Sequence, residues 1–221
     1  MKKSSSILVA ALLVAFPASP GLAQNLSAGV KGGIDFANLG GDVEDTDSKF
    51  GLSAGASFGL QLHEYFRLQF EGQYVRKGMS IDEPDADIDF NLSYIEFMVP
   101  ATLTIPIENS AFTPRFYAGP ALAIETSCGI SAEEDGLSLD IDCDELYEAS
   151  GGYLPDFETK TLDFGMFFGG GVDVALGSGA ITVDFLYNLG LTNINDIPGD
   201  PDDVKNRNIQ ILAGYKFFFG G

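Results

Sequence analysis

Eight stretches of this chain alternate apolar and polar residues with a period of two, each for about a dozen positions. From residue 66 to residue 74, for example, aromatic and aliphatic side chains dominate every second position, while Arg, Gln and Glu occupy the positions between them. Successive side chains of a β-strand point to opposite faces, so each stretch would present one apolar and one polar face. This pattern is typical of a transmembrane β-barrel, in which the apolar faces meet lipid and the polar faces line the interior.

We expect the strands near residues 26–37, 50–62, 65–77, 92–105, 112–125, 161–176, 180–192 and 206–219. Each is long enough to cross the hydrocarbon core as a tilted strand, which takes about nine to eleven residues. Short connections alternate with long ones, which lie at residues 38–49, 78–91, 126–160 and 193–205. The predicted fold class is therefore an all-β, eight-stranded antiparallel up-and-down transmembrane β-barrel. In bacterial barrels the short turns face the periplasm, so the long loops should be extracellular and both termini periplasmic.

The start of the chain has the features of a secretory signal. Lys2 and Lys3 precede an apolar run from Ile7 to Phe16, and small residues follow up to Ala23. The apolar run has about ten residues, whereas a spanning helix needs about twenty. We expect residues 1–23 to be a signal peptide and residues 24–221 to form one outer-membrane barrel domain.

The charge distribution separates the two kinds of connection. Of the 32 Asp and Glu residues, 23 lie in the four long connections, and only 10 Lys and Arg residues follow the predicted leader. Nucleic acid is an improbable partner, because neutralising phosphates needs an excess of cations. A lipid-facing charge at mid-membrane costs about 2–4 kcal/mol for Lys or Arg, so a barrel confines its charges to loops and interior.

Six segments resemble the porin-like outer-membrane β-barrel family in its eight-stranded form. They lie at residues 29–33, 68–78, 94–100, 117–120, 187–194 and 214–217. The resemblance implies a small integral barrel in the bacterial outer membrane, and it carries no catalytic residues. We expect a monomer whose partners are outer-membrane lipid and the barrel-assembly machinery. One departure is that Gly220 and Gly221 follow Phe219, where an aromatic residue usually closes the last strand as the insertion signal.

Charged residues at inward positions should meet in the barrel interior. The predicted lumen network consists of Lys31, Arg67, Glu71, Glu96, Arg115, Asp173, Asp184 and Lys216, and Asp35 and Asp163 should face the lumen as well. Side chains just fill the interior of an eight-stranded barrel. Isolated charges there would carry a heavy desolvation cost, so opposite signs should pair across the lumen. The main interpretation is a structural ion-pair plug, and the alternative is a narrow, gated conduction path.

Two cysteines, Cys128 and Cys143, lie in the third long connection. In an exported protein such a pair is more often bridged than free. The bridge would close a loop of about fifteen residues and contribute about 3 kcal/mol in the chain-entropy model. The alternative is a reactive or metal-binding thiol pair, although two sulfurs make an incomplete zinc site.

Alternating acids in two long connections suggest a tentative calcium site. The candidates are Asp85, Asp87, Asp89, Asp140, Asp142 and Asp144. Neither run is an EF-hand, because the sixth position, which requires Gly, is Phe90 in one run and Glu145 in the other. Plain solvated loops are the main interpretation, and no other cofactor is expected.

The function that these features favour is structural or interactive, at the cell surface, and not enzymatic. The single histidine, His63, falls in a short turn without a nearby Ser nucleophile. Four alternatives stay open: a narrow porin-like channel, a calcium-dependent binder or adhesin that uses the third long loop, a soluble ligand-binding barrel of lipocalin type, and a membrane-embedded hydrolase. The long strands and the asymmetric loops argue against the soluble barrel.

Overall fold

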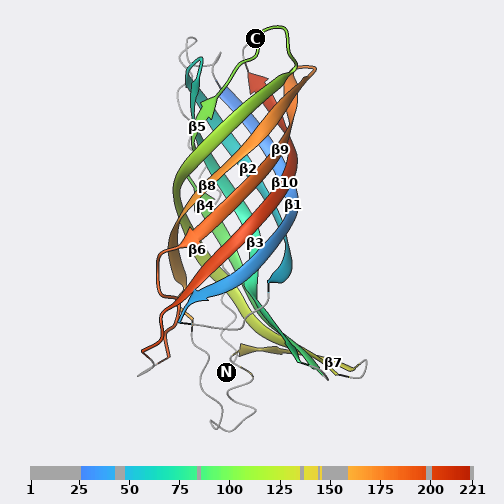
Figure 1. Ribbon diagram of the computed structural model, residues 1–221, viewed down its shortest axis with the longest axis vertical. Helices are drawn as coiled ribbons and strands as arrows, with labels where there is room; N and C mark the ends of the chain where they lie inside the picture. Colours follow the sequence, from blue (N-terminus) through green and yellow to red (C-terminus); the bar gives the residue numbers. More distant parts are fainter. Residues whose placement is uncertain are drawn as a thin grey trace, which may run out of the picture.

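The structure is a computed structural model that describes residues 26–42, 48–83, 86–134, 137–143, 145, 159–197 and 201–219. Ten strands form one antiparallel sheet: β1 (Leu26–Gly41), β2 (Lys49–His63), β3 (Phe66–Glu83), β4 (Ala86–Met98), β5 (Ala101–Thr104), β6 (Phe112–Glu134), β7 (Leu137–Asp142), β8 (Leu162–Leu176), β9 (Gly179–Gly190) and β10 (Val204–Phe219). The sheet closes on itself, because β1 pairs with both β2 and β10 and the path continues round to β3, which pairs with β2. Figure 1 shows the resulting cylinder of tilted strands. Within the described ranges, no helix has the length and apolar character needed to cross a membrane.

The barrel wall has eight strands, because β4 and β5 are two parts of a single wall strand. Residues on both sides of the gap between them keep one register against β6. Pro100 lies in this gap and Pro120 lies close to it on β6, and a proline has no N–H to donate to the ladder. The Pro120 carbonyl still accepts a hydrogen bond from the Val99 N–H at 3.2 Å. The predicted eight-stranded, antiparallel, up-and-down barrel is therefore confirmed.

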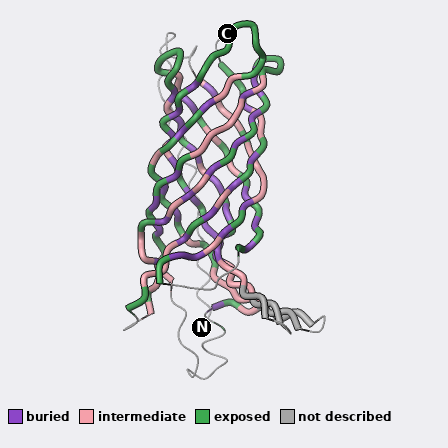
Figure 2. The backbone as a smooth tube through the Cα atoms, viewed as in Figure 1, coloured by how far each residue is buried: buried purple, intermediate pink, exposed green. Residues whose placement is uncertain are grey.

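Apolar side chains cover the outside of the wall and polar side chains point inward. On β9, for example, Val183 and Phe185 are 44% and 53% exposed, whereas Asp184 between them is 3% exposed. Buried and exposed residues also alternate along much of the barrel wall in Figure 2. This is the arrangement that the period of two predicts, with the apolar face of each strand toward lipid.

The connections divide between the two ends of the barrel. The short turns after β2, β5 and β8 lie at one end, together with Leu26 and its partner Phe219, the first and last residues of the paired strands β1 and β10. The four long connections predicted from the sequence start at the other end. Two of them differ from the expectation of plain loops, because β3, β4 and β6 continue into residues 78–91 and 126–134 and β7 adds a fourth strand.

These extensions form a sheet that we call the lateral arm, made of residues 78–83, 86–91, 129–134 and 137–142. The arm leaves the barrel sideways, near the label β7 in Figure 1. It begins at Gly78, whose φ of 127° favours glycine. A Cβ at this position would lie 1.9 Å from the Phe90 carbonyl oxygen. The sequence continues to alternate apolar and polar residues here, so the strands extend beyond the membrane.

A disulfide joins Cys128, at the base of the arm on β6, to Cys143, directly after β7. Their Cα atoms are 5.5 Å apart and the sequence separation is 15. The predicted disulfide is confirmed. Its position shows that it holds the β6–β7 hairpin, rather than the ends of an irregular loop.

Candidate functional site

Seven of the eight charges predicted for the lumen meet near the short-turn end of the barrel. We call them the short-turn cluster: Lys31, Arg67, Glu71, Arg115, Asp173, Asp184 and Lys216. Each occupies an inward position of its strand and is at most 8% exposed, apart from Lys31, which is half-buried and whose side chain is 7% exposed. They come from β1, β3, β6, β8, β9 and β10, so only closure of the barrel brings them together.

Asp173 is the centre of this cluster. Its carboxylate lies 2.7 Å from Arg115 Nε, 3.0 Å from Lys216 Nζ and 3.7 Å from Arg67 NH1. The contacts to the two arginine atoms lack hydrogen-bond geometry and are ion pairs by distance alone. Three cations around one carboxylate would repel one another, but Arg115 also lies 2.8 Å from Asp184.

The remaining charges of the cluster are satisfied locally. Lys31 forms an ion pair with Glu71, which also accepts a hydrogen bond from the Gln69 side-chain amide at 3.2 Å. The hydroxyl of Tyr117 donates to Asp184 at 3.0 Å. Buried charges are tolerated only when they are paired and hydrogen-bonded in this way.

Glu96 does not join that network, because it lies in a second group toward the long-loop end. Lys77 Nζ lies 2.9 Å from Glu96 and 3.7 Å from Asp163. Glu96 also accepts hydrogen bonds from the amides of Asn188 at 2.6 Å and Gln73 at 2.7 Å. We call Lys77, Glu96 and Asp163 the long-loop cluster.

The sequence analysis missed Lys77, although the signal was present. Lys77 stands at an odd position of β3, like Arg67 and Glu71, and the period of two therefore places it inside. Its side chain is only 3% exposed. Without it, the carboxylates of Glu96 and Asp163 would have no cation within ion-pair distance among the described residues.

Asp35 faces the lumen as predicted but has no partner. It is 0% exposed, and neither carboxylate oxygen accepts a hydrogen bond from a described residue. Its side chain lies over Gly51 on β2, where a Cβ would come within 2.6 Å of the carboxylate. The glycine thus makes room for a buried acid, and an ordered water is the usual partner of such a group.

Apolar side chains lie between the two charged clusters. Tyr117, Phe167 and Leu186 pack together with Met98 and Ala121, and on β9 Leu186 falls between Asp184 of one cluster and Asn188 beside the other. The pattern of polar residues on the inward face did not predict these bulky side chains.

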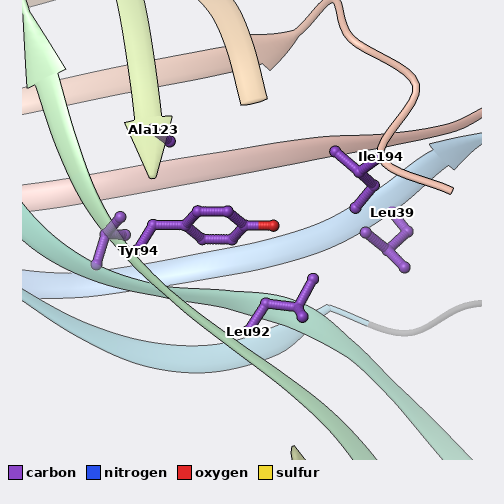
Figure 3. Close-up of a cluster of buried hydrophobic side chains, with 6 residues drawn as sticks. Leu39, Leu92, Tyr94, Ala123 and Ile194 are labelled. Carbon is purple, nitrogen blue, oxygen red and sulfur yellow. The ribbon is translucent and has the colours of Figure 1, made fainter. Parts of the chain in front are cut away.

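A second apolar group closes around Tyr94 at the long-loop end. Leu39, Leu92 and Ile194 belong to this group, with Val75 and Ala123. Figure 3 shows the Tyr94 ring crossing the interior, with Leu39 and Ile194 beyond its hydroxyl end.

Of the six acids proposed for calcium, the structure describes the side chains of Asp89 and Asp142, so the predicted site stays a prediction. Asp89 forms an ion pair with Lys49 at 2.7 Å and accepts a hydrogen bond from Ser80, while Asp142 is exposed on β7. Asp87 and Asp140 lie in β4 and β7, and Asp85 and Asp144 fall outside the described residues. No group of three His, Cys, Asp or Glu side chains in the described part of the chain is arranged to hold a metal.

The electrostatics of Asp89 reflect its two partners, Lys49 at the start of β2 and Ser80 in the arm. Partial burial raises the pKa of this carboxyl, but the hydrogen bonds from Lys49 and Ser80 outweigh burial and hold the pKa below its usual value. Asp89 is therefore a charged partner of Lys49 at neutral pH.

His63 lies at the exposed end of β2. Its Nδ1 accepts a hydrogen bond from the Tyr65 N–H at 3.4 Å, and the two rings are 5.7 Å apart. Both contacts belong to the turn itself. Among the described residues, His63 has no nucleophile as a hydrogen-bond partner.

Comparisons with known proteins agree with this architecture. The family described as outer membrane protein beta-barrel domain matches residues 8–217. No curated protein matches the chain. Among solved structures, Neisserial surface protein A superposes with a TM-score of 0.50 at 16% identity, over 88% of this chain and 97% of that one. OprG of Pseudomonas aeruginosa gives a TM-score of 0.42 at 14% identity, over 88% of this chain and 97% of that one.

At 16% identity, the superposition with Neisserial surface protein A shows a shared fold and nothing finer. The family match, however, extends over nearly the whole chain, and it agrees with the closed sheet and the lipid-facing apolar wall. The chain is therefore an integral protein of the bacterial outer membrane, and it belongs to the outer membrane protein β-barrel family.

Proposed function

We propose that this barrel carries no solute through its lumen and acts instead as a structural or surface-interaction protein, through the lateral arm and the acidic extracellular connections. The proposal includes a monomeric, non-catalytic barrel with periplasmic termini. Residues 1–23 would be its signal peptide, which N-terminal sequencing of the mature protein tests.

The observation that carries the proposal is the layered interior. Along the barrel axis, the short-turn cluster is followed by Phe167 and Leu186 with their neighbours, then by the long-loop cluster and finally by the Tyr94 group. A solute would have to displace ion pairs and apolar side chains in turn. Breaking a buried pair costs about 3–5 kcal/mol, which makes such a path costly at every layer.

A second observation supports the outward-facing role. The arm extends the wall strands beyond the membrane, and a disulfide fixes its β6–β7 hairpin. Most of the acids lie in the four long connections, which leaves the interior close to charge balance. An ordered sheet presented outside the membrane is suited to contact with other surfaces.

Planar-bilayer recording of the refolded protein tests the closed lumen. We expect no step of porin-like conductance at moderate voltage. As a positive control, Phe167→Ala combined with Leu186→Ala would thin the apolar layer and raise the frequency of small conductance events. Porin-like conductance by the unaltered protein would overturn the closed-lumen proposal.

Deletion of the β6–β7 half of the arm tests the surface role. Removing residues 127–157 retains Thr126 and Thr159, whose hydroxyls donate to the Ser93 carbonyl at 3.0 Å and to Glu125 at 2.7 Å. We expect the shortened barrel to fold, as judged by its shift in gel migration on boiling, but to lose attachment of the cells that display it to other surfaces. Unchanged attachment by the shortened barrel would leave only the structural role.

The narrow channel is the second candidate, because the long-loop half of the lumen holds unsatisfied polar atoms. Asp35 has two such oxygens, and both side-chain atoms of Asn208 lack partners among the described residues. Water molecules would satisfy them. The same bilayer recording distinguishes the two cases. A hydrated but closed pocket gives no conductance, whereas a conducting path gives current steps.

A further inference from the structure

A cleft of about 380 Å³ lies between the outside of the barrel wall and the lateral arm. Its barrel side includes Tyr74 and Arg76 of β3, and its arm side includes Asp142 and Glu145. Hydroxyl and amide groups of Ser93, Ser127 and Asn91 lie between them. The lining is therefore mainly polar, with a cation on one side and two carboxylates on the other.

The cleft begins where the lipid-facing surface ends. On β3 the outward row consists of Phe66, Leu68, Phe70, Gly72 and Tyr74, and the next outward residue is Arg76. Tyr74 is still 42% exposed on the apolar wall, and Arg76 follows about 7 Å further along the strand. Aromatic residues mark the membrane interface in outer-membrane barrels, so the headgroup layer lies at the level of Arg76. A ligand of this cleft would therefore come from the membrane.

Arg76 is exposed and forms no ion pair with a described residue. Seven of the ten Lys and Arg residues that the structure describes do form one. The other three are Arg76, Lys160 and Arg207, and Arg76 lies at the headgroup level, where its guanidinium interacts with the neutral hydroxyl of Tyr74. The planar fork of arginine fits a phosphate in two parallel hydrogen bonds.

The strand register places Asp142 beyond Arg76, away from the acyl chains. Arg76 pairs with Ser93 on β4, whereas Asp142 lies in the next row outward, which runs through Asn91 and Gly129. One row corresponds to about 7 Å and each strand step to about 4.8 Å. Asp142 and Glu145 are both exposed and would repel a headgroup that is purely anionic.

We propose that this cleft binds the headgroup of a membrane lipid that carries a phosphate next to its acyl chains and a primary amine beyond the phosphate. Arg76 binds the phosphate, and Asp142 and Glu145 bind the ammonium. The proposal is independent of whether the lumen is closed, because it concerns only the outer surface and the arm.

Native mass spectrometry tests this with the full barrel, released from an uncharged polyoxyethylene detergent that has no phosphate of its own. One short-chain lipid is added at a time: phosphatidylethanolamine, phosphatidylglycerol, which lacks the amine, or diacylglycerol, which lacks the phosphate as well. For the unaltered protein we expect a single adduct with phosphatidylethanolamine, about fivefold tighter than with phosphatidylglycerol, and none with diacylglycerol. Equal binding of the first two lipids would overturn the proposed amine recognition.

The matched control for Arg76 is Arg207, an outward arginine near the same end of β10. Its guanidinium lies over Gly40, outside the cleft. Arg76→Gln should weaken the phosphatidylethanolamine adduct about tenfold, because a charge-assisted hydrogen bond is lost, while Arg207→Gln should leave it within about twofold. Equal effects of the two variants would mean that any cation at the rim of the barrel attracts the lipid. That result would refute binding in the cleft.

Two further experiments complete the test. Asp142→Asn with Glu145→Gln should remove the preference for phosphatidylethanolamine without weakening phosphatidylglycerol, and an unchanged preference would refute the role of the carboxylates. Free phosphoethanolamine should not displace the lipid at equal concentration, and efficient displacement would refute the membrane as the source. Each variant is used only after the gel-migration shift and an intact disulfide show that it is folded.

Discussion

Lys77 should be among the most important single residues for the stability of this barrel. Its ammonium is the one described cation within ion-pair distance of Glu96 and Asp163, and all three side chains are at most 3% exposed. Asp35, also buried, has no hydrogen-bond partner among the described residues. Lys77→Met keeps the length and most of the volume of the side chain but removes the charge.

The expected loss follows from the desolvation of charges. Removing one partner of a buried ion pair leaves an uncompensated charge and costs about 3–5 kcal/mol. Lys77→Met leaves two carboxylates in that condition, so the loss should reach the upper part of this range. Lys205 provides the control, because it pairs with Asp203 while its side chain is 30% exposed, and such pairs contribute about 0–1 kcal/mol.

The free energy of unfolding can be measured by guanidinium titration of the barrel in lipid vesicles. The chain contains no Trp, so far-ultraviolet circular dichroism is the suitable signal. We expect Lys77→Met to lower the unfolding free energy by about 4 kcal/mol and Lys205→Met by less than about 1 kcal/mol. Adding Glu96→Gln to Lys77→Met should recover at least half of the loss, because one buried charge disappears.

Two results would refute this reasoning. Equal losses for the two lysine variants would show that burial of Lys77 does not matter. If the double variant were no more stable than Lys77→Met, the loss would come from packing and not from the unpaired carboxylates.

Four further predictions concern the arm and its acids. Cys128→Ser should leave the gel-migration shift of the barrel intact but speed protease cleavage within the arm, because the bridge contributes about 3 kcal/mol to its order. Gly78→Ala should lower stability by about 1–3 kcal/mol, measured by the same titration, since its Cβ would clash with the Phe90 carbonyl. Because the pKa of Asp89 is lowered, its pairing with Lys49 is fully present above the unfolded value of about 3.8 and is lost as the pH falls through the folded value. Pepsin should therefore cleave the arm faster as the pH drops below about 4, and less steeply so in Lys49→Gln. Calorimetry with millimolar calcium should give no binding heat, and a stoichiometric signal would support the calcium hypothesis instead.

The period of two was sufficient to predict the wall, because lipid on one side and a narrow interior on the other act on every residue of a spanning strand. It did not show where the membrane ends. Residues 78–91 continue the alternation in water, so the pattern could not separate a loop from the base of the arm. The disulfide was predictable from compartment and spacing, but its role in the arm depends on the pairing of β6 with β7.

Inside the barrel, the sequence predicted which charges face inward but not how they divide. Glu96 was grouped with Arg115 and Lys216, yet it pairs with Lys77 in another layer. The height of a residue along the axis depends on strand tilt and register, which a period of two does not contain. Phe167 was missed because a period of two gives only the face of a residue, whereas its packing with Tyr117 and Leu186 depends on the height of each side chain along the axis.

The short-turn cluster has a consequence for biogenesis. Asp173 on β8 receives its cations from β3, β6 and β10, so its set of ion pairs is complete only after the last strand has docked. A barrel without its last strand would expose unpaired charged side chains to acyl chains or to the translocating machinery. We expect insertion to be an all-or-none event in which the final strand, through Lys216, completes the ion pairs around Asp173, so that chains cut before this residue stall as unreleased intermediates.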